Sequence, residues 1–478
     1  MAPMKEDDNK VHSTTSRVLK ALGIFGGVQV ASIICSVIRT KLAALWIGPA
    51  GVGLMAVYNS TIELMTQTSQ LSLNQSTVPD LAKTRHDSVA GPATVGAVRK
   101  LIRSLGLIAF ALMLVFSPLM SRWAFGDTTH IVAFCVLSLV MIFNGFTNSE
   151  ATIMRGYDRL KELARMAICT SVATVLTAVP LFYFFRIKAV VPVLLFSYGY
   201  NSLFALIFRP KDIKAAKTGL EQAWRENKSM LSLGMYMTVS TFVSLLASNI
   251  FVIYLNRCYT DTAVGIYQAG YTLINTYVGM IFMALSMEFY PRLSAARERS
   301  RMEVIVSHEI KIAMWVLMPV VVGFICCGKL ALDILYSDKF YGALPFIIIG
   351  GAGVLFRAAS NCIAYTILAK GSGRLYIITE TASAVSYLVL YIPLFNRFGY
   401  MGLGIGYVLW YAFYYAVVYY IYRKRFGMRL RKGISTLIAT AFGVALLAVA
   451  GTYTIGGWWT LAILLPPTTY AALKGLRG

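Results

Sequence analysis

The chain has 478 residues, of which 57% are hydrophobic, and its mean hydropathy is +0.65. Ordinary globular proteins are about 45 to 50% apolar, so this composition excludes a soluble domain and predicts a membrane protein with many spans. The net charge of +23 would suggest a nucleic-acid ligand in a soluble protein. Here the basic residues gather in alternate loops, which instead indicates the positive-inside rule. Residues 1–17 are polar, and we expect no cleaved signal peptide.

The first predicted hairpin, residues 20–46 and 52–77, carries a polar stripe on each helix. Residues three and four apart share a helix face. The first stripe consists of Gln29, Ser32, Ser36 and Arg39, with Lys41 close by; the second consists of Asn59, Glu63, Gln67, Gln70 and Asn74. An ionised side chain in hydrocarbon costs about 2.5 to 3.5 kcal/mol on insertion scales, so the stripes should face protein or a watery cavity. The alternative, that they only hold helices together, stays open.

The same hairpin occurs twice in the chain. Val52-Gly53-Leu54 recurs as Val264-Gly265-Ile266, and Pro79-x-Leu81 recurs as Pro291-x-Leu293, both with a shift of 212 residues (264 minus 52, and 291 minus 79). Internal repeats in a membrane chain are typical of transporters whose substrate site lies between the two halves. The duplication therefore predicts a transport function.

Apolar windows of about twenty residues predict fourteen transmembrane helices. They lie near 20–46, 52–77, 101–121, 130–154, 164–185, 188–208, 229–255, 264–289, 311–335, 343–369, 375–395, 401–422, 434–452 and 457–473. The predicted fold is all-α and polytopic, with two six-helix bundles related by the repeat and two further helices. We expect a tail at 1–17, bundles at 18–209 and 229–422, a basic linker at 210–228 and a C-terminal pair at 423–478.

The distribution of Lys and Arg predicts that both termini are cytoplasmic. Of the 44 Lys and Arg, all but ten, that is 34, lie in the N-terminus, the loops on the same side and the C-terminal tail. The ten others are Arg39, Lys41, Arg122, Arg186, Lys188, Arg257, Lys329, Lys339, Arg357 and Arg397. The outer loops are short, so we expect no extracytoplasmic domain.

Enzymatic motifs are not visible in the sequence. The stretch Gly323 to Lys329 has the spacing of a phosphate-binding loop, but Leu330 replaces the Ser or Thr that would hold magnesium. The four His and seven Cys show no metal-ligand spacing, and no clustered carboxylates could hold magnesium. Gly402, Gly404 and Gly406 lie in an apolar helix, where they favour close helix packing. We predict no enzymatic activity and no cofactor.

Charges inside the predicted membrane region are the candidate site. Arg357 lies near the middle of the tenth span, and its fixed fork of donors suits a phosphate or carboxylate. The alternative is that Arg357 pairs permanently with Glu63 or Glu380. Tyr271 is related to Asn59 by the repeat shift. The predicted substrate-binding set comprises Arg39, Lys41, Asn59, Glu63, Gln67, Gln70, Asn74, Tyr271, Asn275, Arg357, Asn361 and Glu380.

Several of these segments resemble the Wzx-type flippases of lipid-linked oligosaccharides, in the polysaccharide transporter branch of the MATE-like MOP superfamily. The resemblance is carried by Lys41-Leu42-Ala43, Gly48 to Leu54, Tyr336 to Phe340, Ile367 to Lys370 and Glu380, and by the number and duplication of the spans. It implies two bundles that form a V, a cationic central cavity and alternating access. Basic residues at Lys41 and Arg357 fit that pattern, whereas Arg39 is an addition to it.

The resemblance also implies the substrate. It would be an undecaprenyl-pyrophosphate-linked oligosaccharide, such as an O-antigen unit, moved from the cytoplasmic to the periplasmic leaflet of the bacterial inner membrane. A polysaccharide polymerase and a chain-length regulator are the implied partners, and the coupling ion, H⁺ or Na⁺, stays open. Three alternatives remain: a lipid II flippase, a cation-coupled multidrug antiporter, and, from another class, an O-antigen polymerase or ligase.

Overall fold

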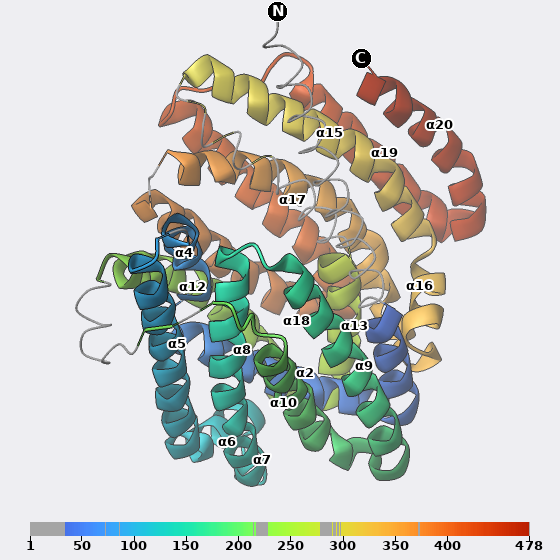
Figure 1. Cartoon of the computed structure of the whole chain (residues 1–478). Coiled ribbons are helices and arrows are strands. Elements are labelled where there is room, and N and C mark those ends of the chain that lie inside the picture. The colour runs from blue at the N-terminus through green and yellow to red at the C-terminus, as the bar shows by residue number, and fades with distance from the viewer. Residues whose placement is uncertain are drawn as a thin grey trace, which may run out of the picture. The chain divides into compact units, whose positions relative to one another are not determined.

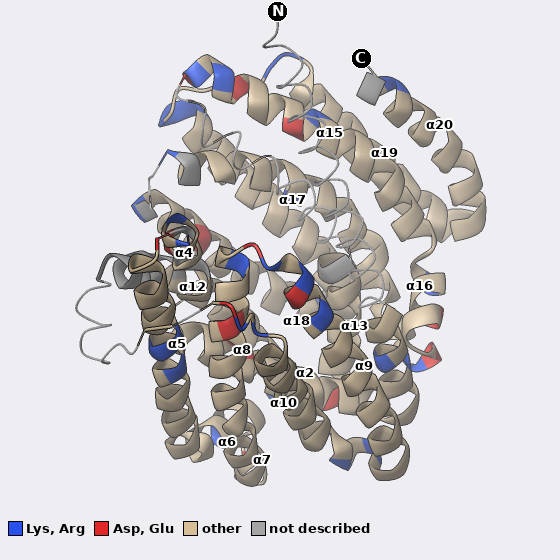
Figure 2. Cartoon of the chain, viewed as in Figure 1, with Lys and Arg blue, Asp and Glu red and all other residues tan. Residues whose placement is uncertain are grey.

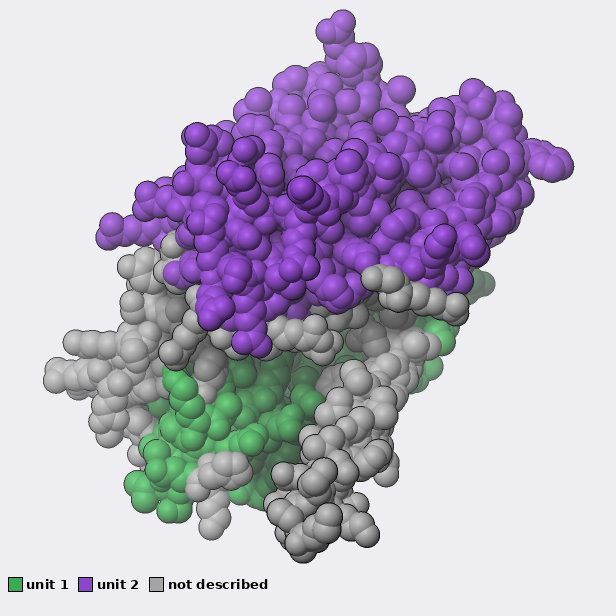
Figure 3. Space-filling view, turned by 90° about the horizontal axis from the view of Figure 1, so that it is seen from above, with its two compact units in different colours: residues 1–47, 61–238 green, residues 48–60, 239–478 purple. Residues whose placement is uncertain are grey.

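The computed structural model describes residues 34–71, 73–85, 87–213, 215–216, 228–277, 289, 293, 296, 298–370 and 373–477. Every regular element in these ranges is a helix, so the predicted all-α class is confirmed (Figure 1). The chain forms two compact units, coloured in Figure 3: unit 1 comprises residues 1–47 and 61–238, and unit 2 comprises 48–60 and 239–478. The tail 1–17, Gln29 and Ser32 of the first stripe, Pro291 and most of the linker 210–228 lie outside the described residues.

Unit 1 is built around helices that pack side by side. Residues 34–46 are helical, and the second part of α2 (Gly48–Ser69) follows. The others are α3 (Leu73–Ser76), α4 (Val78–Thr84), α5 (Ala90–Val115), α6 (Ser117–Phe125), α7 (Ile131–Leu137), α8 (Leu139–Gly156), α9 (Leu160–Phe185), the 3₁₀ turn η1 (Arg186–Ala189) and α10 (Val190–Ile207). Helix α8 packs against α5 and α10, and α10 packs against α9.

Two glycines bring α5 and α8 unusually close together. A Cβ atom added to Gly106 would lie 3.0 Å from the Cα atom of Gly145. Small residues at a crossing let two helix backbones approach in a membrane. Because the helices are antiparallel here, the residues that precede Gly106 lie beside those that follow Gly145. This crossing sets the positions of the charged residues described below.

Unit 2 contains the first part of α2 and most of the C-terminal half. Its elements are the part of α12 (Lys228–Cys258) from residue 239 on, α13 (Asp261–Thr272), the π-helical turn η2 (Leu273–Tyr277), α15 (Arg299–Cys326), α16 (Gly328–Leu335), η3 (Asp338–Ala343), α17 (Leu344–Ala369), α18 (Gly373–Lys424), α19 (Ile434–Thr454) and α20 (Gly457–Arg477). Helix α17 packs against α15, α18 and α19. Helices α15, α19 and α20 lie side by side (Figure 1).

Helix α18 is two antiparallel arms joined at Gly399. The backbone of Gly399 has φ 59° and ψ −140°, a conformation that favours glycine. Across the turn, the indole N–H of Trp410 donates to the carbonyl oxygen of Ser383 at 2.9 Å. A Cβ atom on Gly402 would overlap the carbonyl oxygen of Leu394, and one on Gly404 would lie 3.1 Å from that of Pro345 in α17. The close packing predicted for these glycines is therefore confirmed.

The repeated glycines Gly53 and Gly265 lie against each other in unit 2. A Cβ atom on Gly53 would overlap the carbonyl oxygen of Asp261, and one on Gly265 would overlap the carbonyl oxygen of Pro49. The first turns of α2 and α13 therefore meet backbone to backbone. This contact explains why residues 48–60 cluster with unit 2, although α2 continues unbroken into unit 1.

Seven helical stretches in the described ranges are long and apolar enough to cross a membrane, or eight when the bent pair α5 and α6 is one span. Two of these stretches, 160–207 and 374–424, are 48 and 51 residues long. Each could cross twice, since one crossing needs about 20 residues. Most of the ribbon carries no charge, and α19 contains none (Figure 2). The count of fourteen stays a prediction.

Candidate functional site

Arg357 lies in the middle of α17, thirteen residues after Leu344 and twelve before Ala369. Its Nη1 atom donates to the Oδ1 atom of Asn275 at 2.7 Å and to the hydroxyl oxygen of Tyr407 at 3.3 Å. The Tyr407 hydroxyl also donates to Asn275 Oδ1 at 3.4 Å. Three elements, η2, α17 and α18, therefore fix the position of one guanidinium group.

Aromatic rings form one wall of this site. The guanidinium carbon of Arg357 lies 5.8 Å from the ring centre of Tyr411, within the range of a cation–π contact. The rings of Tyr407 and Tyr411 are 4.8 Å apart. Tyr271 lies within electrostatic range of Arg357, and its carbonyl oxygen accepts from Asn275 Nδ2 at 3.2 Å.

The turn that carries Asn275 is π-helical. Turns of this kind are rare overall, but those that occur are frequently at functional sites. Asn361, one turn after Arg357 in α17, is half-buried. The structure thus brings together the predicted residues Asn275 and Arg357. We name Tyr271, Asn275, Arg357, Tyr407 and Tyr411 the Arg357 site.

Sequence reasoning missed Tyr407 and Tyr411. A signal was present, since tyrosines recur at 407, 411, 415 and 419, each four residues after the last. We predicted Glu380 as part of the same site. The hydroxyl of Tyr414 donates to Glu380 Oε1 at 2.7 Å, and Glu380 lies within electrostatic range of Tyr411. Its role in binding stays a prediction.

The remaining predicted residues of unit 1 separate into two groups. Glu63 is exposed and Arg39 is half-buried, and both lie within electrostatic range of Tyr198 in α10. Lys41 and Gln67 are also half-buried. Their role in substrate binding stays a prediction. Asn59, by contrast, belongs to unit 2 and is half-buried in α2.

Gln70 and Asn74 lie in a polar seam between the segment 66–74 and α8. Asn144 Nδ2 donates to Thr66 Oγ1 at 3.0 Å, Asn148 Nδ2 donates to Gln70 Oε1 at 2.6 Å, and Thr152 Oγ1 donates to the carbonyl oxygen of Asn74 at 3.4 Å. On each of the two segments the bonded residues are four apart. Each hydrogen-bonded pair therefore lies one helical turn beyond the previous pair. The seam gives Gln70 a role in helix packing.

A buried carboxylate that we did not predict lies near this seam. Glu150 in α8 is fully buried, and its Oε2 atom accepts from Arg99 Nη2 at 2.7 Å. Its Oε1 atom accepts from Arg103 Nη2, and Arg103 Nε donates to Ser149 Oγ at 3.2 Å. The guanidinium of Arg103 also lies over the ring of Phe146. We name Arg99, Arg103 and Glu150 the carboxylate clamp.

Comparison with solved structures shows the class of fold. The chain is similar to the lipid II flippase MurJ in an inward closed conformation, with a TM-score of 0.67 and 13% identity over 94% of this chain and 97% of that one. It is also similar to a multidrug resistance MATE family transporter of the MOP superfamily in an inward-facing conformation, with a TM-score of 0.65 and 17% identity over 86% and 96%. The fold is therefore that of the MATE-like MOP superfamily.

A family model described as "Polysaccharide biosynthesis protein" matches residues 100–345. The chain belongs to this family. It is 22% identical over 401 residues to the lipid III flippase of Escherichia coli strain K12, covering 80% of this chain and 94% of the relative. It is 21% identical over 376 residues to a Shigella flexneri protein named "Putative O-antigen transporter", covering 75% and 87%.

Proposed function

We propose that this chain is a flippase that moves an undecaprenyl-pyrophosphate-linked oligosaccharide from the cytoplasmic to the periplasmic leaflet by alternating access. The flippase relative matches over most of both chains, and its name supports transport rather than catalysis. The division of the chain into two compact units suits a mechanism in which domains move. O-antigen or another polysaccharide repeat unit is the proposed oligosaccharide.

The Arg357 site is the observation that carries this proposal. A guanidinium halfway along a membrane helix is retained against an insertion cost of about 3 kcal/mol. Charge-assisted bonds to a diphosphate can offset that cost, and the planar fork fits two phosphate oxygens at once. Asn275 and Tyr407 both accept from Nη1, so they hold the group in one orientation. The aromatic wall suits the sugar or prenyl part next to the diphosphate.

We propose that the transport path in unit 1 is lined by the exposed and half-buried predicted residues. In unit 1 the proposed lining residues are Arg39, Lys41, Glu63 and Gln67. In unit 2 the proposed lining residues are Asn59, Tyr271, Asn275, Arg357 and Asn361. The set contains three basic side chains and one acidic side chain. This balance favours an anionic substrate over the organic cations of a multidrug antiporter. Lipid II bears the same diphosphate, so the two flippase substrates differ in their sugars.

Removal of the Arg357 guanidinium tests the proposed function. In a strain that depends on this chain for glycan export, Arg357→Ala should abolish surface glycan at a matched membrane level. Arg357→Lys should keep part of the export, because the charge remains and the fork is lost. Arg397→Ala is the matched control, since Arg397 is exposed near the turn of α18. Normal export by Arg357→Ala would refute the proposal.

A second arm distinguishes substrate binding from permanent pairing with Glu63. If Arg357 served only to balance Glu63, the double variant Arg357→Ala with Glu63→Gln should export normally, because no uncompensated charge would remain. If Arg357 binds the diphosphate, the double variant should be as defective as Arg357→Ala. Glycan on the cell surface is measured for both single variants and the double variant.

We further propose that the protein lies in the bacterial inner membrane with both termini in the cytoplasm, and that a polysaccharide polymerase and a chain-length regulator act with it. The orientation rests on the distribution of basic residues. Reporter fusions after Lys432 should report the cytoplasm, and fusions near Arg397 the periplasm. Swapped results would reverse the proposed orientation and require the transport direction to be assigned again.

A further inference from the structure

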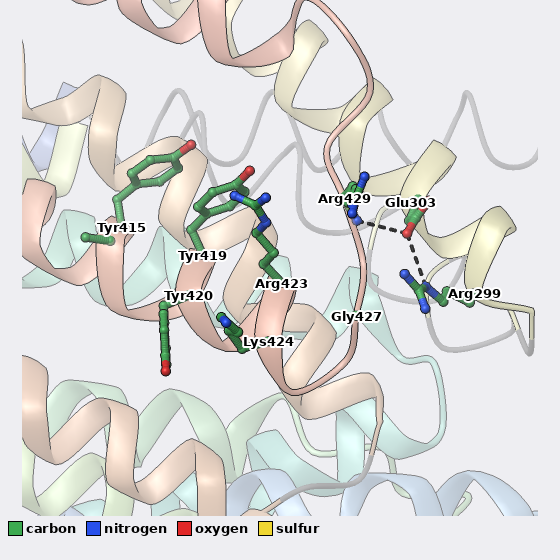
Figure 4. A pocket seen from close by; sticks show the side chains of 10 residues that line it. Arg299, Glu303, Tyr415, Tyr419, Tyr420, Arg423, Lys424, Gly427 and Arg429 are labelled. Carbon is green, nitrogen blue, oxygen red and sulfur yellow. Dashed lines mark hydrogen bonds and ion pairs between the residues drawn. The ribbon is translucent and has the colours of Figure 1, made fainter.

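A second cationic site lies at the end of α18, away from the Arg357 site. A cavity of about 1210 Å³ is lined there by three segments of unit 2: the end of α18, the connection to α19, and the start of α15 (Figure 4). Its lining residues are Tyr415, Ala416, Tyr419, Tyr420, Arg423, Lys424, Gly427, Arg429, Arg299 and Glu303. Along α18, Arg423 is about 24 Å from Tyr407, so the cavity is distinct from the Arg357 site.

The connection that closes this cavity is held against α15. The backbone N–H of Arg429 donates to Glu303 Oε1 at 2.9 Å, and that of Arg431 donates to Ser307 Oγ at 3.0 Å. Gly427 has φ +64°, and a Cβ atom there would lie 2.8 Å from a terminal nitrogen of Arg299. Met428 is buried, with 1% of its surface exposed. The cavity wall is therefore a built part of the fold.

The charge of the lining is strongly positive. Four basic residues, Arg299, Arg423, Lys424 and Arg429, face one acid, Glu303, which leaves a formal charge of +3. One oxygen of Glu303 already accepts from the Arg429 amide and from Arg299 Nε, the latter at 3.3 Å. That carboxylate therefore orients the connection as well as balancing one charge. The arrangement suits an anion with several oxygens, such as a phosphate or diphosphate.

Tyrosines supply the other side of the cavity and place it at the membrane surface. The rings of Tyr415 and Tyr419 are stacked at 5.8 Å, and Tyr420 is 64% exposed. Tyrosine at the end of a membrane helix is typical of the interface, where one side of the ring meets lipid and the hydroxyl meets water. Figure 4 shows Arg423 beside Tyr419, at the end of α18. A ligand there can keep its chains in the bilayer and its phosphate among the arginines.

We propose that this cavity binds the phosphate or diphosphate headgroup of a membrane lipid. The lipid is either an anionic phospholipid of the bilayer or a prenyl diphosphate, since both offer the same headgroup chemistry. The site is additional to the Arg357 site, and it does not depend on the proposed transport function. Bound lipid would join α15, α18 and the connection between α18 and α19 through one headgroup.

Lipid binding to the purified full chain tests this proposal. Native mass spectrometry would count bound phosphatidylglycerol, a short-chain prenyl diphosphate and phosphatidylcholine on the wild type and on the double variant Arg423→Gln with Arg429→Gln. We expect the double variant to lose about 30-fold in affinity for the two anionic lipids. The matched control is Arg425→Gln, because Arg425 is exposed on the same connection and does not line the cavity.

The outcomes separate the lipid sources and the alternatives. Stronger binding of the prenyl diphosphate, lost in the double variant, would support the site and identify a prenyl lipid; stronger binding of phosphatidylglycerol would support it and identify a phospholipid. Equal loss in the Arg425→Gln control would overturn the proposal, as would binding of phosphatidylcholine as tight as that of the anionic lipids. Inorganic pyrophosphate that binds as tightly as either lipid would show a soluble-anion site instead. The unfolding midpoints of all variants are compared to exclude misfolding.

Discussion

Each of the two units holds arginine between its packed helices, but the two units surround it differently. In unit 1 the carboxylate clamp gives Glu150 two arginines, and both carboxylate oxygens are used. In unit 2 the contacts of Arg357 among the described residues include an amide, a phenol and an aromatic face, which are neutral. A carboxylate balances charge and fixes helices, whereas neutral groups orient a cation and preserve its charge for an anion. This difference predicts a structural role for the clamp, and it supports the proposal that Arg357 binds an anion.

The largest expected effect is on stability, from breaking the clamp. Glu150→Gln should lower the free energy of unfolding by about 3 to 5 kcal/mol, because two partly buried guanidinium groups would lose their counter-charge. The unfolding midpoint in detergent measures this. Glu162→Gln is the control, since its carboxylate is 27% exposed and lies 3.9 Å from Arg159. An unchanged midpoint for Glu150→Gln would mean that the clamp does not stabilise unit 1.

A smaller effect, on transport, should follow removal of one group that orients Arg357. Tyr407→Phe keeps the ring and deletes the hydroxyl, so we expect glycan export to fall about fivefold at an unchanged protein level, in line with one hydrogen bond of about 1 kcal/mol. Tyr183→Phe is the matched control, because Tyr183 is 61% exposed in α9. Full export by Tyr407→Phe would remove Tyr407 from the Arg357 site.

The smallest effect is expected in the polar seam. A double-mutant cycle with Gln70→Ala and Asn148→Ala should give a coupling free energy of about 0.6 kcal/mol, a typical value for hydrogen bonds between membrane helices. Chemical unfolding of the two single variants and the double variant measures it. Zero coupling would separate the two residues energetically despite their 2.6 Å contact. Loss of export by Gln70→Ala at normal stability would instead return Gln70 to the binding set.

The sequence was sufficient to predict the helical class, and it identified Arg357 and Asn275 as candidates. A charge inside an apolar run is visible without any knowledge of packing. Tyr407 and Tyr411 were missed because an aromatic residue in an apolar helix has the same pattern whether it packs in a core or faces a guanidinium. Their position beside Arg357 follows only from the approach of α18 to α17.

The carboxylate clamp was missed for a different reason. Arg99 and Arg103 lie at the start of a predicted span and therefore resembled ordinary loop charges. Glu150 is 51 residues from Arg99 and 47 residues from Arg103 in the chain. Their meeting depends on the antiparallel crossing of α5 and α8 at Gly106 and Gly145, which periodicity cannot give. The allocation of residues 48–60 to unit 2 likewise depends on a contact between helix ends.

That contact has a consequence for how the two copies of the duplicated unit can change over time. Duplication normally frees one copy to vary while the other preserves the original role. Gly53 and Gly265 occupy the same place in the two copies, yet each leaves room for the backbone of the other copy's helix. A side chain gained at either glycine would therefore clash with the helix of the other copy. At this position neither copy can vary independently.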